Sequence, residues 1–164
     1  MRLPADLLTT LNDEYTLERY SNGVYMALAA QFEKLSLTGF AEWARRAADD
    51  EATHARKFFD YLTDRNETPV VDQLDPAPTL RPDPLALFQA ALEQERTVSD
   101  ALRAIYAQAE ELSDPPTCEF LLWFLKEQVE SERDLTTITG KLSAAAGDYG
   151  AVLFLDHELG EGEK

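Results

Sequence analysis

Residues 68–84, "TPVVDQLDPAPTLRPDP", form the one long extended segment in a chain that otherwise has the sequence pattern of helices. Five of the eight prolines of the chain lie in this segment, at positions 69, 76, 78, 82 and 84. Proline lacks an amide donor and clashes with the preceding turn, so a run of this kind does not continue a helix. On both sides of the segment, apolar residues recur every three or four positions, as in amphipathic helices. The segment therefore divides the chain into two helical halves and must connect them.

The remaining breaks in the pattern predict four long helices and a short fifth one. Asp83 before Pro84 and Asp114 before Pro115 are typical of an N-cap followed by proline in the first turn. We place a break at 37–39, the end of the fourth helix near Gly140 and the end of the fifth at Gly160. The predicted helices are 6–34, 39–65, 84–112, 115–143 and 149–159. Two short connections and one long crossover between the second and third helices indicate a single all-α domain over residues 1–164, a ferritin-like four-helix bundle with a short fifth helix.

The composition excludes several classes of partner. Acidic residues number 31 against 15 basic ones, and the net charge of −16 argues against nucleic acid and anionic membranes and favours cations. No run of 18 apolar residues predicts a transmembrane span, and the first residues lack the pattern of a signal peptide. Cys118 is the single cysteine, which fits a reducing compartment, so we expect a cytoplasmic protein.

The apolar stripe of each long helix is interrupted near its middle by polar residues. On the first helix the predicted inward residues are Leu8, Leu11, Tyr15, Glu18, Asn22, Tyr25, Ala29 and Phe32. The interruptions on the four helices are Glu18, Glu51 with His54, Glu95, and Gln128. Glu18 and Glu51 are 33 residues apart, as are Glu95 and Gln128, so two similar hairpins would bring all of them to one depth.

Carboxylates that converge in a core repel one another unless they are protonated or bind cations. A single glutamate on an amphipathic helix is usually solvated, but interruptions at equal spacing on core-facing positions favour a metal site. Carboxylate oxygens with one imidazole suit iron or manganese, whereas a zinc–thiolate site needs cysteines that this chain lacks.

The motifs that carry these residues resemble the non-haem bacterial-type ferritins. They are "LNDEYTLERYSNGVY" (11–25), "FAEWARRAADDEATHARKFFDYL" (40–62), "EQER" (93–96), "FLLWFLKEQVESE" (120–132) and "GAVLFLDHEL" (150–159). The resemblance implies a ferroxidase centre that oxidises Fe2+ to Fe3+ with O2 or peroxide. Glu18, His54 and the bridging Glu51 would hold the first iron, and Glu51 with Glu95 the second. Gln128 would orient water or oxygen beside the second iron, and Tyr25 matches the family's tyrosine next to the centre.

The same resemblance implies further features of the family. A third iron site would use Asp50, Glu127 and Glu130, although Ser131 stands where the family often has a glutamate, and solvated acidic side chains explain these residues equally well. Glu119 matches the lining of the threefold channels, whose usual second acidic position is Leu122 here. The apolar stretch "AVLFL" of the fifth helix favours burial against a partner, and the resemblance implies that this partner is another subunit of a homo-oligomeric cage of 24.

Three alternatives remain at this stage. A haem-containing bacterioferritin would place methionine where this chain has Ala52, and Glu-x-x-His where it has Gln128 and Ser131, so no haem is expected. A rubrerythrin-like oxidase would usually add a cysteine-ligated iron, which one cysteine cannot form. A purely structural bundle would lack the ligands.

Overall fold

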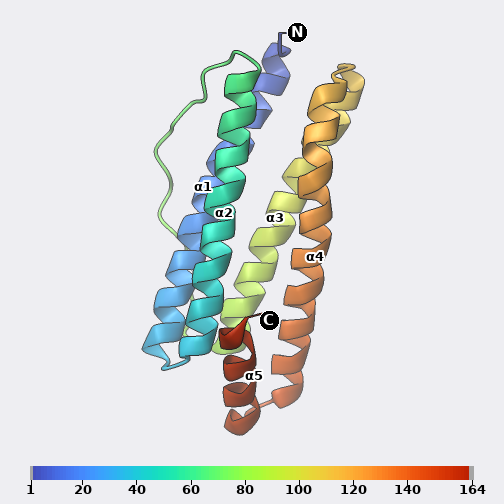
Figure 1. The fold of residues 1–164 in the computed structure, drawn as a ribbon. Helices are drawn as coiled ribbons and strands as arrows, with labels where there is room; N and C mark the ends of the chain where they lie inside the picture. Colours follow the sequence, from blue (N-terminus) through green and yellow to red (C-terminus); the bar gives the residue numbers. More distant parts are fainter. Residues whose placement is uncertain (1, 163–164) are drawn as a thin grey trace.

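The computed structural model describes residues 2–162, which fold into five helices (Figure 1). The bounds are α1 Ala5–Lys34, α2 Thr38–Asp64, α3 Pro84–Glu111, α4 Pro115–Ala145 and α5 Tyr149–Glu161. Within residues 2–162 there is no strand, so the predicted all-α class is confirmed, and every helix end lies within two residues of its predicted position. None of these helices is both long and apolar enough to cross a membrane.

The four long helices form two antiparallel hairpins, α1 with α2 and α3 with α4 (Figure 1). The segment 65–83 runs along the outside of the first hairpin from the end of α2 to the opposite end of the bundle, where α3 begins, so α2 and α3 are parallel. Two hydrogen bonds hold it to α1: the Val70 amide donates to Asn12 Oδ1 at 2.7 Å, and Arg19 donates to the Asp72 carbonyl at 3.0 Å. The proline-rich segment is thus the crossover that the sequence predicts.

The helix ends follow local chemistry. Asp83 and Asp114 cap α3 and α4 by accepting hydrogen bonds from the backbone amides three residues later, at 3.1 Å in each case, as predicted. The predicted break at 37–39 is wrong by about two residues, because Ser36 takes the left-handed conformation (φ 60°) and α2 begins at Thr38. The helix α4 continues past Gly140 and ends where Ala146 and Gly147 both have positive φ.

The buried stripe of α1 follows a strict alternation of three- and four-residue steps. Its members, each at most 1% exposed, are Leu7, Leu11, Glu14, Glu18, Ser21, Tyr25, Leu28 and Phe32. The predicted stripe was therefore partly out of phase, because Leu8 and Asn22 are only half-buried while the unpredicted Glu14 is buried. This periodicity of 3.5 residues is that of helices in bundles.

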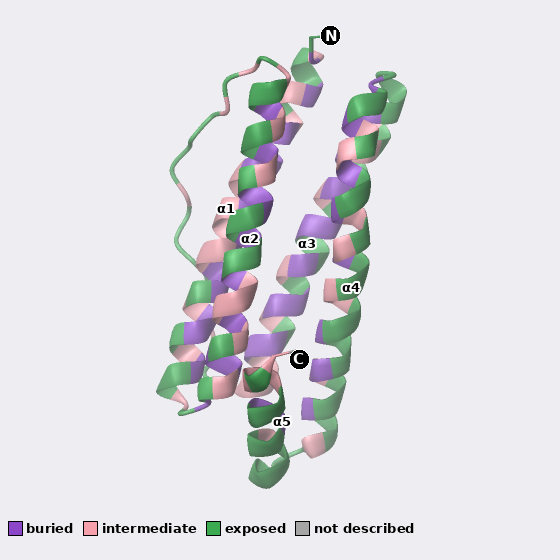
Figure 2. Ribbon diagram, viewed as in Figure 1, coloured by how far each residue is buried: buried purple, intermediate pink, exposed green. Residues whose placement is uncertain are grey.

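The core consists of two apolar clusters with a polar layer between them. Along α1, one cluster ends at Tyr15 and the other begins at Val24, and each of the other long helices is divided in the same way. The residues in the gaps are Glu18, Ser21, Glu51, His54, Glu95 and Gln128. In Figure 2 the buried positions follow the inward faces of the helices, so this polar layer lies within the bundle rather than on its surface.

The short helix α5 packs on the beginning of α2. Leu155 is buried there, and the Asp156 carboxylate accepts a hydrogen bond from the Phe40 amide at 2.7 Å. Gly39 and Gly160 bring the two helices into backbone contact, since a Cβ atom on Gly39 would lie 1.8 Å from the Asp156 carbonyl oxygen. The other side of α5 exposes Tyr149, Leu153 and Phe154.

Candidate metal centre

Three of the predicted ligands converge in the polar layer. Glu18 comes from α1, and Glu51 and His54 lie one turn apart on the same face of α2. One ligand atom from each lies within 4.8 Å of the other two, and all three residues are buried. His54 Nδ1 is 3.2 Å from Glu51 Oε2 and 3.7 Å from Glu18 Oε2.

The polar atoms of this group lack hydrogen-bond partners. Both carboxylate oxygens of Glu18, Glu51 Oε2 and His54 Nδ1 are buried without one. Each such atom costs about 1–3 kcal/mol when it is left unsatisfied. A divalent cation between these atoms would satisfy all of them, and their oxygen-rich character with one imidazole fits iron.

The electrostatics of the site also favour a cation. Burial raises the pKa of Glu51 to about 8, and burial together with the charge of Glu51 raises the pKa of Glu95 to about 7. Burial alone would lower the pKa of the His54 imidazole, but the adjacent Glu18 and Glu51 outweigh it and raise this pKa to about 10. The carboxylates therefore resist ionisation without a positive charge beside them, and a metal ion supplies that charge.

Glu95 lies across the layer and is held by two donors. The Tyr25 hydroxyl donates to its Oε1, and the Gln128 amide donates to its Oε2 at 2.8 Å. Gln128 Nε2 is also 3.1 Å from the Glu95 carbonyl oxygen, so the amide is fixed against α3. Burial and the neighbouring Glu95 raise the pKa of Tyr25 well above its usual value, which keeps its hydroxyl protonated as a donor. The residues predicted for the centre thus form two groups in one buried layer: Glu18 with Glu51 and His54, and Glu95 with Tyr25 and Gln128.

A cavity of about 420 Å³ connects the centre to the surface. Its walls include Tyr25, Glu51, His54 and Glu95 at the inner end, and the exposed Asp50 at the outer end. The cavity gives small solutes a route between solvent and the buried carboxylates.

Glu14 is a buried acid that the sequence interpretation missed. It lies one turn before Glu18 on α1, is 1% exposed, and neither of its carboxylate oxygens has a hydrogen-bond partner. Burial and the charge of Glu51 raise its pKa to about 8. The strict three- and four-residue spacing of α1 was the signal that could have found it.

Comparisons with known proteins agree with this geometry. A family model for the ferritin-like domain matches residues 8–145. The bacterial non-haem ferritin of Bacteroides fragilis is 34% identical over 155 residues, covering 94% of this chain and 96% of that protein. The corresponding protein of Staphylococcus epidermidis is 32% identical over 157 residues, covering 96% of this chain and 95% of the other. An open-pore ferritin from Archaeoglobus fulgidus superposes with a TM-score of 0.95 at 31% identity, over 98% of this chain and 99% of that one.

The chain belongs to the ferritin family. It is an iron-storage ferritin subunit, as its sequence predicts, and ferritins of known structure are cage oligomers. The match covers both hairpins and all the residues of the polar layer.

Within this ferritin, the residues predicted for a third iron site are only partly brought together. Asp50 and Glu127 line the cavity beside the centre, whereas Glu130 does not and lies 4.0 Å from Lys126 on the exposed face of α4. Ser131 also lines the cavity, and the neighbouring Glu132 accepts a hydrogen bond from Ser99 at 2.5 Å. Asp50 and Glu127 therefore line one cavity, whereas the Glu130 side chain would have to change its conformation to reach it.

The predicted channel residue Glu119 is exposed near the beginning of α4, together with Leu122. A channel on a threefold axis lies between subunits, so its lining stays a prediction for the single chain. The adjacent Cys118 is half-buried, and burial raises the pKa of its thiol, as in an unreactive cysteine.

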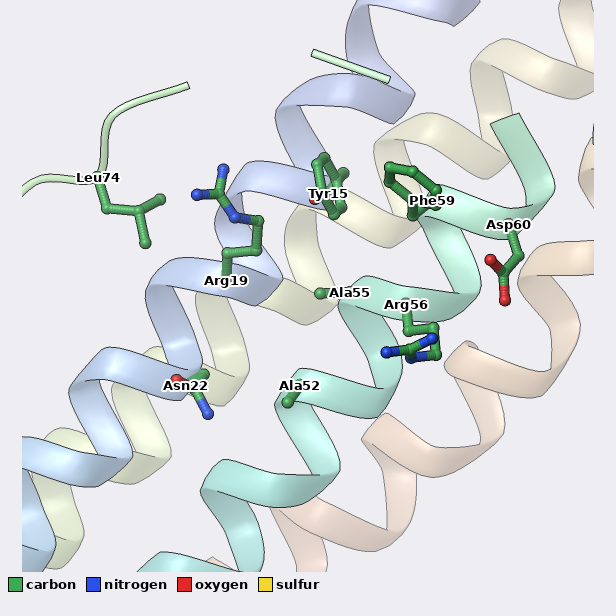
Figure 3. A pocket seen from close by; sticks show the side chains of 9 residues that line it. All are labelled: Tyr15, Arg19, Asn22, Ala52, Ala55, Arg56, Phe59, Asp60 and Leu74. Atoms are coloured by element: carbon green, nitrogen blue, oxygen red, sulfur yellow. The ribbon is translucent and has the colours of Figure 1, made fainter. Parts of the chain in front are cut away.

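A second cavity contains the position at which a haem-binding ferritin would need its ligand (Figure 3). It has a volume of about 470 Å³ and lies on the outer side of α1 and α2, under Leu74 of the crossover. Ala52 lines it, at the position where the haem-containing relatives would place methionine. Aromatic side chains (Tyr15, Phe59) and charged ones (Arg19, Arg56) both line this cavity, and alanine at position 52 offers no sulfur ligand to a haem.

Proposed function

We propose that this subunit is a ferroxidase whose substrates are Fe2+ and an oxidant, O2 or peroxide. The observation that carries the proposal is the group of buried, unpartnered ligand atoms on Glu18, Glu51 and His54. Glu18, His54 and a bridging Glu51 would bind the first Fe2+, and Glu51 with Glu95 the second. Two Fe2+ ions give one electron each to O2, which takes up two protons and leaves as hydrogen peroxide.

The protein residues would act by position and charge. Carboxylates stabilise Fe3+ more than Fe2+, so a site of several glutamates favours the oxidised product. Gln128 and Tyr25 hold the Glu95 carboxylate from two sides, which fixes it in place for the second ion. Gln128 would also orient water or oxygen beside that ion, and the cavity past Asp50 would admit the small substrates.

The proposed setting is a cytoplasmic cage of 24 copies. The exposed apolar residues of α5 and the cage structures of the family support assembly. Asp50 and Glu127 at the cavity mouth are proposed to attract iron on its way to or from the centre. Glu130 could join them after a change of side-chain conformation, and Glu119 would line the channel.

The experiment is rapid mixing of the apo-protein with Fe2+ in air-saturated buffer, followed by absorbance. A fast phase that saturates at about two irons per chain would support the proposal. Glu51→Ala should abolish the fast phase yet leave the apo-protein at least as stable as the parent, because repulsion among buried carboxylates falls. Glu42→Ala, at an exposed position of the same helix, is the control and should leave the fast phase unchanged.

Two results would contradict this account. Oxidation by the parent no faster than in buffer would mean that the ligands do not form a catalytic centre. A Glu51→Ala apo-protein destabilised by several kcal/mol would mean that Glu51 is structural. Native mass separates the cage from a rubrerythrin-like alternative, since a dimer would favour the latter and a particle of several hundred kilodaltons the former.

A further inference from the structure

The most unusual group in the core outside the proposed ligand set is the Glu14 carboxylate. It is 1% exposed, and both of its oxygens are buried without any hydrogen-bond partner. Such a group is retained at a cost, because a buried carboxylate without a partner is strongly destabilising. No cationic side chain forms an ion pair with it among the described residues.

Glu14 lies next to the centre along α1. It belongs to the same buried stripe as Glu18, one turn away, where Cβ atoms are about 5–6 Å apart. It also lies close enough to Glu51 and His54 to interact with their charges. Two side chains four residues apart on one helical face can bind one metal ion, as the two histidines of metalloprotease helices do.

A second observation is the balance of charge between the buried glutamates and the two proposed divalent cations. Four glutamates of the polar layer and its border are almost fully buried: Glu14, Glu18, Glu51 and Glu95. When all four are ionised, their four negative charges equal the charge of two divalent cations. With only three carboxylates, two divalent cations would leave one uncompensated positive charge in a low-dielectric core.

We infer that Glu14 is a further metal ligand, which joins Glu18, Glu51 and His54 around the first divalent cation. The inference rests on the proposed di-iron function and extends its ligand set. In the structure only the other three gather within 4.8 Å of one another, so Glu14 joins them by a change of its side-chain torsions when the cation binds. A glutamate at this position thus gives the first site three carboxylates and one imidazole.

The test uses Co2+, which is not oxidised by O2 under these conditions and scatters X-rays anomalously. Crystals of the full-length protein soaked in Co2+ should show a peak bonded to Glu51 and His54, with a Glu14 oxygen at about 2.0–2.2 Å from it. Calorimetric titration should show that Glu14→Gln weakens Co2+ binding at this site by at least about tenfold. Asp13→Asn, which removes a charge from the exposed neighbouring position, should change the affinity by less than about twofold.

Each outcome decides the inference. A peak at Glu51 and His54 with Glu14 elsewhere, or bonded to a water, would overturn it and leave the proposed function intact. Absence of any peak at Glu51 and His54 in the parent would overturn both. Because glutamine has nearly the shape of glutamate and cannot ionise, the Glu14→Gln apo-protein should be at least as stable as the parent, and the crystal of the parent decides the question even if the variant fails to fold.

Discussion

At the scale of single residues, the Tyr25 hydroxyl is the donor that holds Glu95 in place. Tyr25→Phe keeps the ring but leaves Glu95 Oε1 without its hydrogen bond. We expect the apo-protein to lose about 1–3 kcal/mol of unfolding free energy, since a buried acceptor becomes unsatisfied. We also expect Fe2+ oxidation to slow, because Glu95 is then free to turn away. Chemical denaturation and stopped-flow absorbance measure the two effects.

The matched control is Tyr20→Phe, at a half-buried position of the same helix. It should leave both stability and oxidation rate close to the parent values. Unchanged oxidation in Tyr25→Phe would show that Gln128 alone is sufficient to position Glu95.

The sequence predicts most of the site at this scale because carboxylates on apolar helical faces are rare. Glu18, Glu51 and Glu95 stand out in this way, His54 and Gln128 interrupt the same faces as polar residues, and all five are buried. Glu14 did not, because the adjacent Tyr15 was read as the inward residue, and an aromatic side chain beside an acid makes the acid look solvated. Both residues are buried in the structure, and the strict three- and four-residue spacing of the α1 stripe passes through Glu14.

At the scale of helices, one ion pair joins the end of α2 to the beginning of α4. Arg65 donates two hydrogen bonds to Asp114, at 2.9 and 2.7 Å, while Asp114 also caps α4. The Arg65 guanidinium lowers the pKa of Asp114 to about 2. Since this pKa is lower in the folded than in the unfolded chain, the stabilisation is complete above about pH 4 and is lost as the pH falls toward 2.

Asp114→Asn should therefore lower the unfolding free energy by about 3 kcal/mol at pH 6. The difference between parent and variant should narrow as the pH falls from about 4 to 2, because Asp114 of the parent then becomes neutral as well. Denaturant titrations at several pH values measure this. Asp100→Asn, whose partner Arg103 forms an exposed pair on α3, is the control and should cost less than about 1 kcal/mol. A difference independent of pH would mean that capping rather than charge carries the effect.

The docking of α5 gives the second prediction at this scale. Gly39→Ala places a methyl group 1.8 Å from the backbone oxygen of Asp156, which cannot yield as a side chain could. We expect α5 to detach, with loss of about 1–3 kcal/mol and rapid proteolysis in the link at residues 146–148. Gly140→Ala meets no atom within 4 Å and should instead stabilise α4 by about 0.5–1 kcal/mol. Equal protease resistance of the Gly39 variant and the parent would contradict this account of the contact.

The sequence predicts the helices but not these contacts between them. Apolar periodicity and proline positions locate every helix, because both act locally along the chain. The sequence predicts that Gly39 belongs to the break before the second helix, but this residue lies within α2. Its lack of a side chain allows the backbone of α5 to approach the backbone of α2. A close contact with a neighbouring helix does not produce a periodic pattern in the sequence, so the need for a small residue at such a contact is seen only in the folded structure.

At the scale of the whole molecule, we expect the exposed side of α5 to form a contact between subunits. Tyr149, Leu153 and Phe154 are between 44% and 71% exposed in the single chain, whereas Leu155 and Asp156 of the same helix are buried. An apolar surface of this kind favours burial against other copies, and the net charge of −16 makes non-specific association of subunits unfavourable. Assembly should therefore depend on this small face.

Phe154→Asp places a charge in the centre of that face, where burial without a partner is costly. We expect the parent to have a native mass of several hundred kilodaltons by light scattering, and the variant to form only small oligomers with unchanged helix content. Thr97→Asp, at an exposed position of α3, which makes no contact with α5, should assemble like the parent, and this separates an effect of the apolar face from one of added charge. A full-sized particle formed by Phe154→Asp would show that α5 is not part of the interface, and a parent that is itself a dimer would contradict the cage. Oxidation of Fe2+ at the centre should persist in the small oligomers, because every ligand of the centre comes from one chain.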